Sequence, residues 1–160
     1  MTYRPPERIC LAHEPLKRVF YLAHPLALRH EIREKELAFE KRTGVELINP
    51  FYDADREDIV AIDAGTMERF SEKLDFQAIV KNDLDAIDRA QGIVAIVRKG
   101  AISMGTPMEM WYTLTSLKPV FVICYDELKA HPWVLYVTEN SGGFIASSFE
   151  DFERKLTEER

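Results

Sequence analysis

The sequence predicts an α/β protein in which one doubly wound, mostly parallel, five-stranded sheet is covered by helices on both faces. Short apolar runs rich in β-branched and aromatic residues alternate along the chain with longer amphipathic segments. The runs GIVAIV and KPVFVICY are apolar throughout, which is typical of central parallel strands. A chain of 160 residues fits one domain, which we place at residues 18–160 behind an extension at 1–17.

The first half of the chain predicts two strands and two helical regions. Residues 18–23 (RVFYLA) form a strand, and residues 26–42 form a helix that stops before Gly44. Residues 45–49 (VELIN) form the second strand, and the loop PFYDADRED after it is in a position to shape a substrate site. A long helical region, with apolar residues at helical spacing, then covers residues 67–90.

The second half predicts three strands alternating with helices. In order, these are strand 92–97, helix 105–117, strand 118–125, a short helix or turn at 131–137, a loop at 140–148 with an edge strand at 144–146, and helix 149–159. This alternation implies parallel strands joined by helical crossovers, and we expect the flavodoxin-like, Rossmann-like strand order 2-1-3-4-5. Ligands of such sheets bind at the carboxyl ends of the strands, near the switch point.

Charge and composition argue against several classes of binding partner. The net charge of −6 argues against a nucleic-acid polymer, whose phosphates require a basic face. The apolar runs are much shorter than the roughly 20 residues that cross a membrane, and the N-terminus lacks the apolar core of a secretory signal. Cys10 and Cys124 form no disulfide or metal pattern, so we expect free thiols and a cytoplasmic location. The four histidines lack ligand spacing, so we expect no metal.

The segment SMGTPME, residues 103–109, joins a buried strand to a helix and is the strongest candidate site. Gly105 allows the backbone to approach a ligand, and the helix start offers unpaired amides to an anion. Glu109 falls in the first turns, on the inner side of the helix. In the alternative interpretation Thr106 caps the helix and Glu109 only complements its dipole. Neither a GxGxxG nor a P-loop pattern is present in the sequence.

Two further residues are candidates. Asp83 lies beside the apolar positions Leu84 and Ile87 near the middle of its helix, although an acidic helix face is often merely solvated. Tyr21 lies in the last turn of the first strand, facing the switch point, although a strand tyrosine is more often part of the core.

Three segments in order carry a resemblance to a known family: YLAHPL, KNDLDAIDRAQGIVAIV and SMGTPMEMWYTLTSLKPVFVI. Over roughly residues 18–145 the sequence resembles the nucleoside 2-deoxyribosyltransferases. The resemblance implies that Glu109 is the nucleophile, that Asp83 is the acid or positions the sugar, and that Tyr21 orients Glu109. These roles suit cleavage of a C1′–N bond, because a carboxylate can stabilise or trap the developing oxocarbenium ion while a second acid protonates the base. No cofactor is required.

The departures from that family favour a hydrolase. Transferases commonly carry Asp where this chain has Ser103, whereas the related 2′-deoxynucleoside 5′-monophosphate N-glycosidases carry Ser and use it for the 5′-phosphate. We therefore expect Ser103 and the amides near Gly105 to bind phosphate, helped by His24 or Arg29. His24 replaces the usual Gly after the first strand, where it would crowd the substrate unless it binds it. The resemblance also implies a homodimer or higher homo-oligomer with shared active sites. The related hydrolases use a serine from the neighbouring subunit where this chain has Asn140 and Ser141, whereas transferases place an asparagine there, so these two residues leave the choice open.

The sequence thus predicts an N-glycosidase acting on a (2′-deoxy)nucleoside 5′-monophosphate, a small-molecule substrate. Two alternatives stay open. One is a deoxyribosyltransferase that passes the sugar to another base. The other is a non-catalytic nucleotide-binding module on the same fold, since fold does not fix function.

Overall fold

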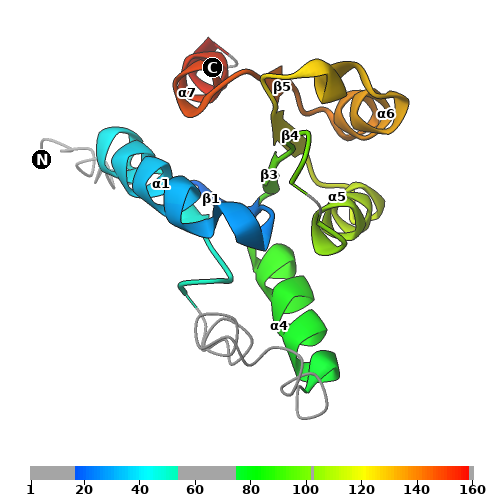
Figure 1. The fold of residues 1–160 in the computed structure, drawn as a ribbon. Coiled ribbons are helices and arrows are strands. Elements are labelled where there is room, and N and C mark those ends of the chain that lie inside the picture. The colour runs from blue at the N-terminus through cyan, green and yellow to red at the C-terminus, as the bar shows by residue number, and fades with distance from the viewer. Residues whose placement is uncertain (1–16, 54–74, 102, 159–160) are drawn as a thin grey trace, which may run out of the picture.

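A computed structural model of the protein describes residues 17–53, 75–101 and 103–158, and these form one sheet with helices on both faces (Figure 1). The sheet has the order β2-β1-β3-β4-β5 and every pairing is parallel, so the predicted doubly wound fold and strand order are confirmed. The strands are β1 (Val19–Ala23), β2 (Glu46–Ile48), β3 (Ile93–Ile96), β4 (Val120–Ile123) and β5 (Ile145–Ala146).

Helices follow the strands as right-handed crossovers require. They are η1 (Leu26–Leu28), α1 (Arg29–Thr43), α4 (Phe76–Arg89), α5 (Gly105–Thr115), η2 (Glu127–Ala130), α6 (Pro132–Ser141) and α7 (Phe149–Glu158). Figure 1 shows α1 and α7 on one side of the sheet and α4, α5 and α6 on the other. None of the helices among the residues described is long and apolar enough to span a membrane.

Two clusters of buried side chains fill the two faces, because successive residues of a strand point to opposite sides. The cluster under α1 and α7 is built largely from phenylalanine and branched side chains, among them Phe20, Phe39, Phe121, Phe149 and Phe152. The cluster under α4, α5 and α6 is built from smaller side chains together with one phenol, among them Tyr21, Ala23, Ala95, Val122 and Cys124.

Several element boundaries differ from those expected. The first predicted helix begins with the 3-10 turn η1, and α1 ends at Gly44, whose φ of 72° places it in the left-handed region. Most consequential is α6, predicted as a short helix or turn but extending to Ser141. Its start is stabilised by His131, whose side chain accepts from the amide of Trp133, and by Pro132 in the first turn. Residues 1–16, and 67–74 of the predicted long helix, lie outside the described residues.

Candidate active site

A hydrogen bond between Tyr21 and Glu109 joins β1 to α5. Tyr21 is fully buried, yet its hydroxyl donates to Glu109 Oε1 at 2.8 Å across 88 positions of sequence. Glu109 lies in the second turn of α5 and is half-buried. A hydroxyl that donates to one carboxylate oxygen restricts the side chain to few rotamers. The structure therefore brings together two of the three residues expected to be catalytic.

Ser103 caps the start of α5. Its hydroxyl accepts from the amide of Thr106 at 3.1 Å and donates to Thr106 Oγ1 at 2.9 Å. The sequence offered Thr106 as the cap, but Thr106 is buried at 4% exposure and instead receives the Ser103 proton. Gly105 begins the helix, and a Cβ there would lie 3.9 Å from Glu109 Oε1. Ser103, Gly105 and the Glu109 carboxylate thus gather at the carboxyl end of β3.

Asp83 is half-buried on α4, the helix that packs beside α5. The Tyr112 hydroxyl donates to the Asp88 carboxylate at 3.0 Å, which ties the two helices together. A common site for Asp83 and Glu109 stays a prediction.

His24 lies on the opposite face of the sheet from Tyr21 and is only 3% exposed. Its Nε2 is 3.2 Å from Asn49 Oδ1 and its Nδ1 is 3.1 Å from the carbonyl oxygen of Pro25. Burial lowers the pKa of His24, while these two hydrogen bonds act in the opposite direction. Both ring nitrogens face protein oxygens, so a direct contact with substrate stays a prediction that would require one of these bonds to open.

Asn140 and Ser141 were expected in a loop but form the last turn of α6. The reason is local: Asn140 donates to the carbonyl of Tyr136 at 2.8 Å, and Ser141 donates to that of Thr138 at 3.1 Å. Ser141 also accepts from the amide of Val120, the first residue of β4, at 2.9 Å. Both residues thus lie at the amino edge of the sheet, away from Glu109 of the same chain. Their role in a neighbouring subunit's site stays a prediction.

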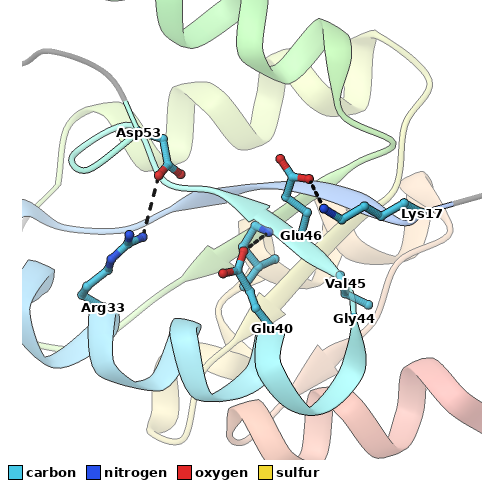
Figure 2. A pocket seen from close by; sticks show the side chains of 8 residues that line it. Lys17, Arg33, Glu40, Gly44, Val45, Glu46 and Asp53 are labelled. Atoms are coloured by element: carbon cyan, nitrogen blue, oxygen red, sulfur yellow. Dashed lines mark hydrogen bonds and ion pairs between the residues drawn. The ribbon is translucent and has the colours of Figure 1, made fainter.

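Two of the cavities along the described residues are large. One, of about 630 Å³, lies between α5 and α6, and its lining is mostly apolar and aromatic: Val97, Pro107, Met108, Met110, Trp111, Leu128, His131, Trp133, Val134 and Val137. The other, of about 480 Å³, runs along the β2 edge and is lined by charged side chains that include Lys17, Arg33, Glu40, Glu46 and Asp53 (Figure 2). None of the residues expected at the site lines either cavity.

A buried polar cluster was not anticipated. Glu36 and Asn49 are both fully buried, and Asn49 Nδ2 donates to Glu36 Oε2 at 2.7 Å. A signal was present, because Ile32, Glu36 and Phe39 share the i, i+4, i+7 spacing of one helix face. Leu37, an apolar residue of the same helix, lies off that face and its side chain is 48% exposed.

In the part of the chain that the structure describes, neither a cysteine nor a metal-binding cluster contributes to the candidate site. Cys124 is a buried thiol whose pKa is raised by burial, and Cys10 lies outside the described residues. No group of three His, Cys, Asp or Glu side chains within residues 17–53, 75–101 and 103–158 could hold a metal ion.

No protein-family model and no curated protein matches the sequence. Solved structures do match. A conserved protein from Enterococcus faecalis V583 superposes with a TM-score of 0.66 at 16% identity, covering 90% of this chain and 99% of that one. The CMP N-glycosidase BcmB from Clostridium botulinum superposes with a TM-score of 0.57 at 17% identity, covering 90% and 100%. At these identities the likeness establishes a shared fold over nearly the whole of each chain.

Proposed function

We propose that the protein hydrolyses the N-glycosidic bond of a nucleoside 5′-monophosphate, with Glu109 as the attacking carboxylate. The observation that carries this proposal is the bond from the buried Tyr21 hydroxyl to Glu109 Oε1. It holds the Glu109 carboxylate at the start of α5, at the carboxyl edge of the sheet where ligands of this fold bind. The shared fold with a CMP N-glycosidase is consistent with such an enzyme.

The proposed reaction uses two carboxylates, one to attack the sugar and one to assist departure of the base or to position the sugar. Glu109 attacks C1′ as the bond to the base breaks, forming a glycosyl-enzyme ester that water then hydrolyses. Asp83, on the neighbouring helix α4, supplies the proton that the departing base requires or positions the sugar hydroxyls. Because Asp83 and Glu109 come from different helices, the sugar would lie between α4 and α5.

The phosphate would bind at the start of α5. The amides in the first turn of this eleven-residue helix point toward the carboxyl edge of the sheet, where a helix N-terminus favours an anion. Ser103 adds a hydroxyl without adding negative charge. Its proton now goes to Thr106 Oγ1 and would turn to a phosphate oxygen on binding.

A deoxyribosyltransferase is the main alternative, and a non-catalytic nucleotide-binding module is the other. A panel of ribo- and deoxyribonucleosides and their 5′-monophosphates, incubated with and without a second base and analysed by chromatography, separates the three. We expect release of a base from a nucleotide, with no new nucleoside when a second base is present. Formation of a new nucleoside would establish the transferase, and binding without turnover would establish the module.

Ser103→Asp tests the phosphate site. An aspartate can still cap Thr106 but repels the phosphate, so kcat/KM for the nucleotide should fall about tenfold or more. The value for the free nucleoside should hardly change. A wild-type enzyme that prefers the free nucleoside would contradict this part of the proposal.

We also propose that the protein is a homo-oligomer joined through the α5–α6 surface. This surface exposes six large apolar side chains: Met104, Met108, Trp111, Trp133, Leu135 and Tyr136. The rings of Trp111 and Trp133 lie 5.9 Å apart across the two helices. Within the ranges of α5 and α6, Glu109 and Glu139 are the only charged residues, which suits an apolar interface between copies. Glu109 lies next to this surface, so a second copy would border the site.

Light scattering coupled to size-exclusion chromatography tests the interface. Trp133→Glu should shift the protein to a smaller species, because it buries a charge in an apolar contact. Leu117→Asn is the matched control, since Leu117 is 94% exposed beyond the end of α5, outside the surface defined above. A wild-type monomer would overturn this proposal and leave the glycosidase proposal standing.

A further inference from the structure

A buried chain of polar side chains ties α1 to the two turns that follow β1 and β2. The Glu36 carboxylate accepts from Arg33 Nη1 at 2.9 Å on one oxygen and from Asn49 Nδ2 at 2.7 Å on the other. Burial raises the pKa of Glu36 to about 7, although the bonds from Asn49 and Arg33 oppose the rise. A buried carboxylate destabilises the fold unless its partners are in place. Its retention in a phenylalanine-rich core therefore calls for a reason beyond packing.

Asn49 is the centre of this chain. Its Oδ1 accepts from the amide of Phe51 at 3.1 Å and lies 3.2 Å from His24 Nε2. A backbone amide only donates, so the carboxamide oxygen must face Phe51 and His24 while the NH2 group faces Glu36. His24 Nε2 must then carry a proton. The Glu36 carboxylate thus selects one orientation of Asn49 and one protonation of His24.

The outer end of the chain is held by an ion pair. Arg33 Nη1 lies 3.9 Å from Asp53 Oδ1, and Figure 2 shows the two side chains pointing toward one another beside the groove along β2. Asp53 Oδ2 in turn accepts from the amide of Asn49 at 2.7 Å. The Arg33 guanidinium also lies over the Tyr52 ring, 4.8 Å from its centre. Every described residue of the turn from Asn49 to Asp53, apart from Pro50, is therefore bonded to its neighbours, to α1 or to His24.

This chain lies at the edge where a substrate would enter. Asn49 directly follows β2 and His24 directly follows β1, the strand that carries Tyr21. The ring of Phe51 packs edge-on against His24, with centres 4.8 Å apart. The catalytic pair, in contrast, belongs to the α4–α5 side of the sheet. A perturbation of Glu36 would reach the wall of the site without touching the attacking carboxylate.

We propose that Glu36 is a positioning residue that, through Asn49, fixes the turn at residues 49–53 and the His24 ring as one wall of the substrate site. This inference rests on the proposed function. It assigns part of the substrate affinity to the α1 side of the sheet, in addition to the phosphate site at the start of α5, and leaves bond cleavage on the α4–α5 side. His24 acts here through the position of its ring, which its hydrogen bond to Asn49 holds, and the inference requires no proton transfer by His24.

Two variants of Glu36 separate this role from simple packing. Glu36→Met fills a similar volume but removes both acceptors, so KM for the nucleotide should rise about tenfold while kcat stays within about twofold. Glu36→Gln keeps an oxygen that can accept from Asn49 Nδ2, so KM should return to within about threefold of the wild type. Phe39→Leu is the control, since it weakens the same helix face without touching the polar chain. KM should be unchanged in this variant.

A second readout does not depend on activity. The Phe51 amide, bonded to Asn49, should exchange with deuterium about a hundredfold faster in Glu36→Met and at the wild-type rate in Glu36→Gln and Phe39→Leu. Should Glu36→Met fail to fold, Asn49→Ser removes the same bridge and should raise both KM and the exchange rate. Unchanged Phe51 exchange in the folded variant, or a fall in kcat at constant KM, would overturn the proposal. If the wild type has no glycosidase activity but the Phe51 amide still exchanges faster in Glu36→Met, only the proposed function is refuted.

Discussion

The two faces of the sheet are packed by different kinds of side chain, although the same strands contribute to both. Toward α1 and α7, Phe152 lies 5.5 Å from the ring centres of both Phe39 and Phe121, and 5.7 Å from that of Phe144. Toward α4 and α5, the strands present Ala23, Ala95 and other small side chains. The first face is filled by interlocking rings. On the second, the small side chains leave space for one phenol to run beneath α5 and reach a carboxylate.

The difference in packing indicates which face of the sheet can accommodate a catalytic site. A face of tightly packed rings offers stability, because each buried ring removes much apolar area from water. A face of small residues lets a strand side chain such as Tyr21 project past its neighbours toward a helix start. The division is not complete, since the ring-filled face ends in the polar chain around Asn49 at the carboxyl edge. That edge is where both faces meet a substrate.

The largest effect should come from the attacking carboxylate. Glu109→Gln keeps the shape of the side chain and an oxygen that can accept from Tyr21, but it cannot attack C1′. Turnover should fall by at least about a thousandfold, while the melting temperature should change little. Single-turnover assays with circular dichroism on the same sample measure both. Near wild-type turnover in a cleanly folded variant would refute the mechanism.

The ring-filled face can be broken independently. Phe152→Ala opens a cavity among four other rings and should lower the free energy of unfolding by about 3–5 kcal/mol. Urea denaturation measures this loss. Well below the transition, the folded enzyme should keep its kcat/KM. A large loss of activity per folded molecule would show that the two faces are coupled more tightly than this comparison implies.

Glu36 should make stability depend on pH. Its pKa is raised from 4.5 to about 7 in the folded protein, so between these values the unfolded chain releases a proton that the folded protein retains. The free energy of unfolding should therefore fall by about 3 kcal/mol as the pH rises through this window, and level off above it. Urea denaturation at pH 5 and pH 8 tests this against Glu36→Gln. A pH dependence identical in both proteins would disprove it.

The smallest effect should come from the hydroxyl that joins the two regions of the site. Tyr21→Phe removes only the donor to Glu109 Oε1, and hydrogen bonds to charged groups contribute about 1.5–3 kcal/mol. We expect kcat/KM to fall by about 10- to 100-fold. Stability should hardly change, since the ring still fills its place in the core. Steady-state kinetics with the preferred nucleotide give the answer, and an unchanged kcat/KM would remove Tyr21 from the catalytic machinery.

Sequence patterns determined most of the fold. Continuous apolar runs identified β3 and β4 as central strands because only strands covered on both faces lack polar positions. The alternation of strands and helices led to the strand order 2-1-3-4-5, which the structure confirms. The position of Glu109 near a helix start also followed from sequence, because turn and cap residues act locally.

Local signals were weaker for the ends of helices. The cluster of Asn140, Ser141 and two glycines suggested a loop, yet the two polar side chains bond back to carbonyls of α6 and extend it. The break falls at Gly142, whose φ is 75°. The same residues can follow a helix or form its last turn, and a partner from another element can favour one outcome. Here the amide of Val120 donates to Ser141 Oγ in the last turn of α6.

Only the tertiary structure decided which distant side chains meet. The contact between Tyr21 and Glu109, and the bridge from Glu36 through Asn49 to His24, depend on how α5 and α1 cross the sheet. Helix and strand periodicities define which side chains share a face, but the height and rotation of each helix over the strands follow from packing between remote segments. For this reason the sequence by itself determined the sheet and the position of Glu109. The partner of Glu109 and the burial of His24 were set by the three-dimensional packing.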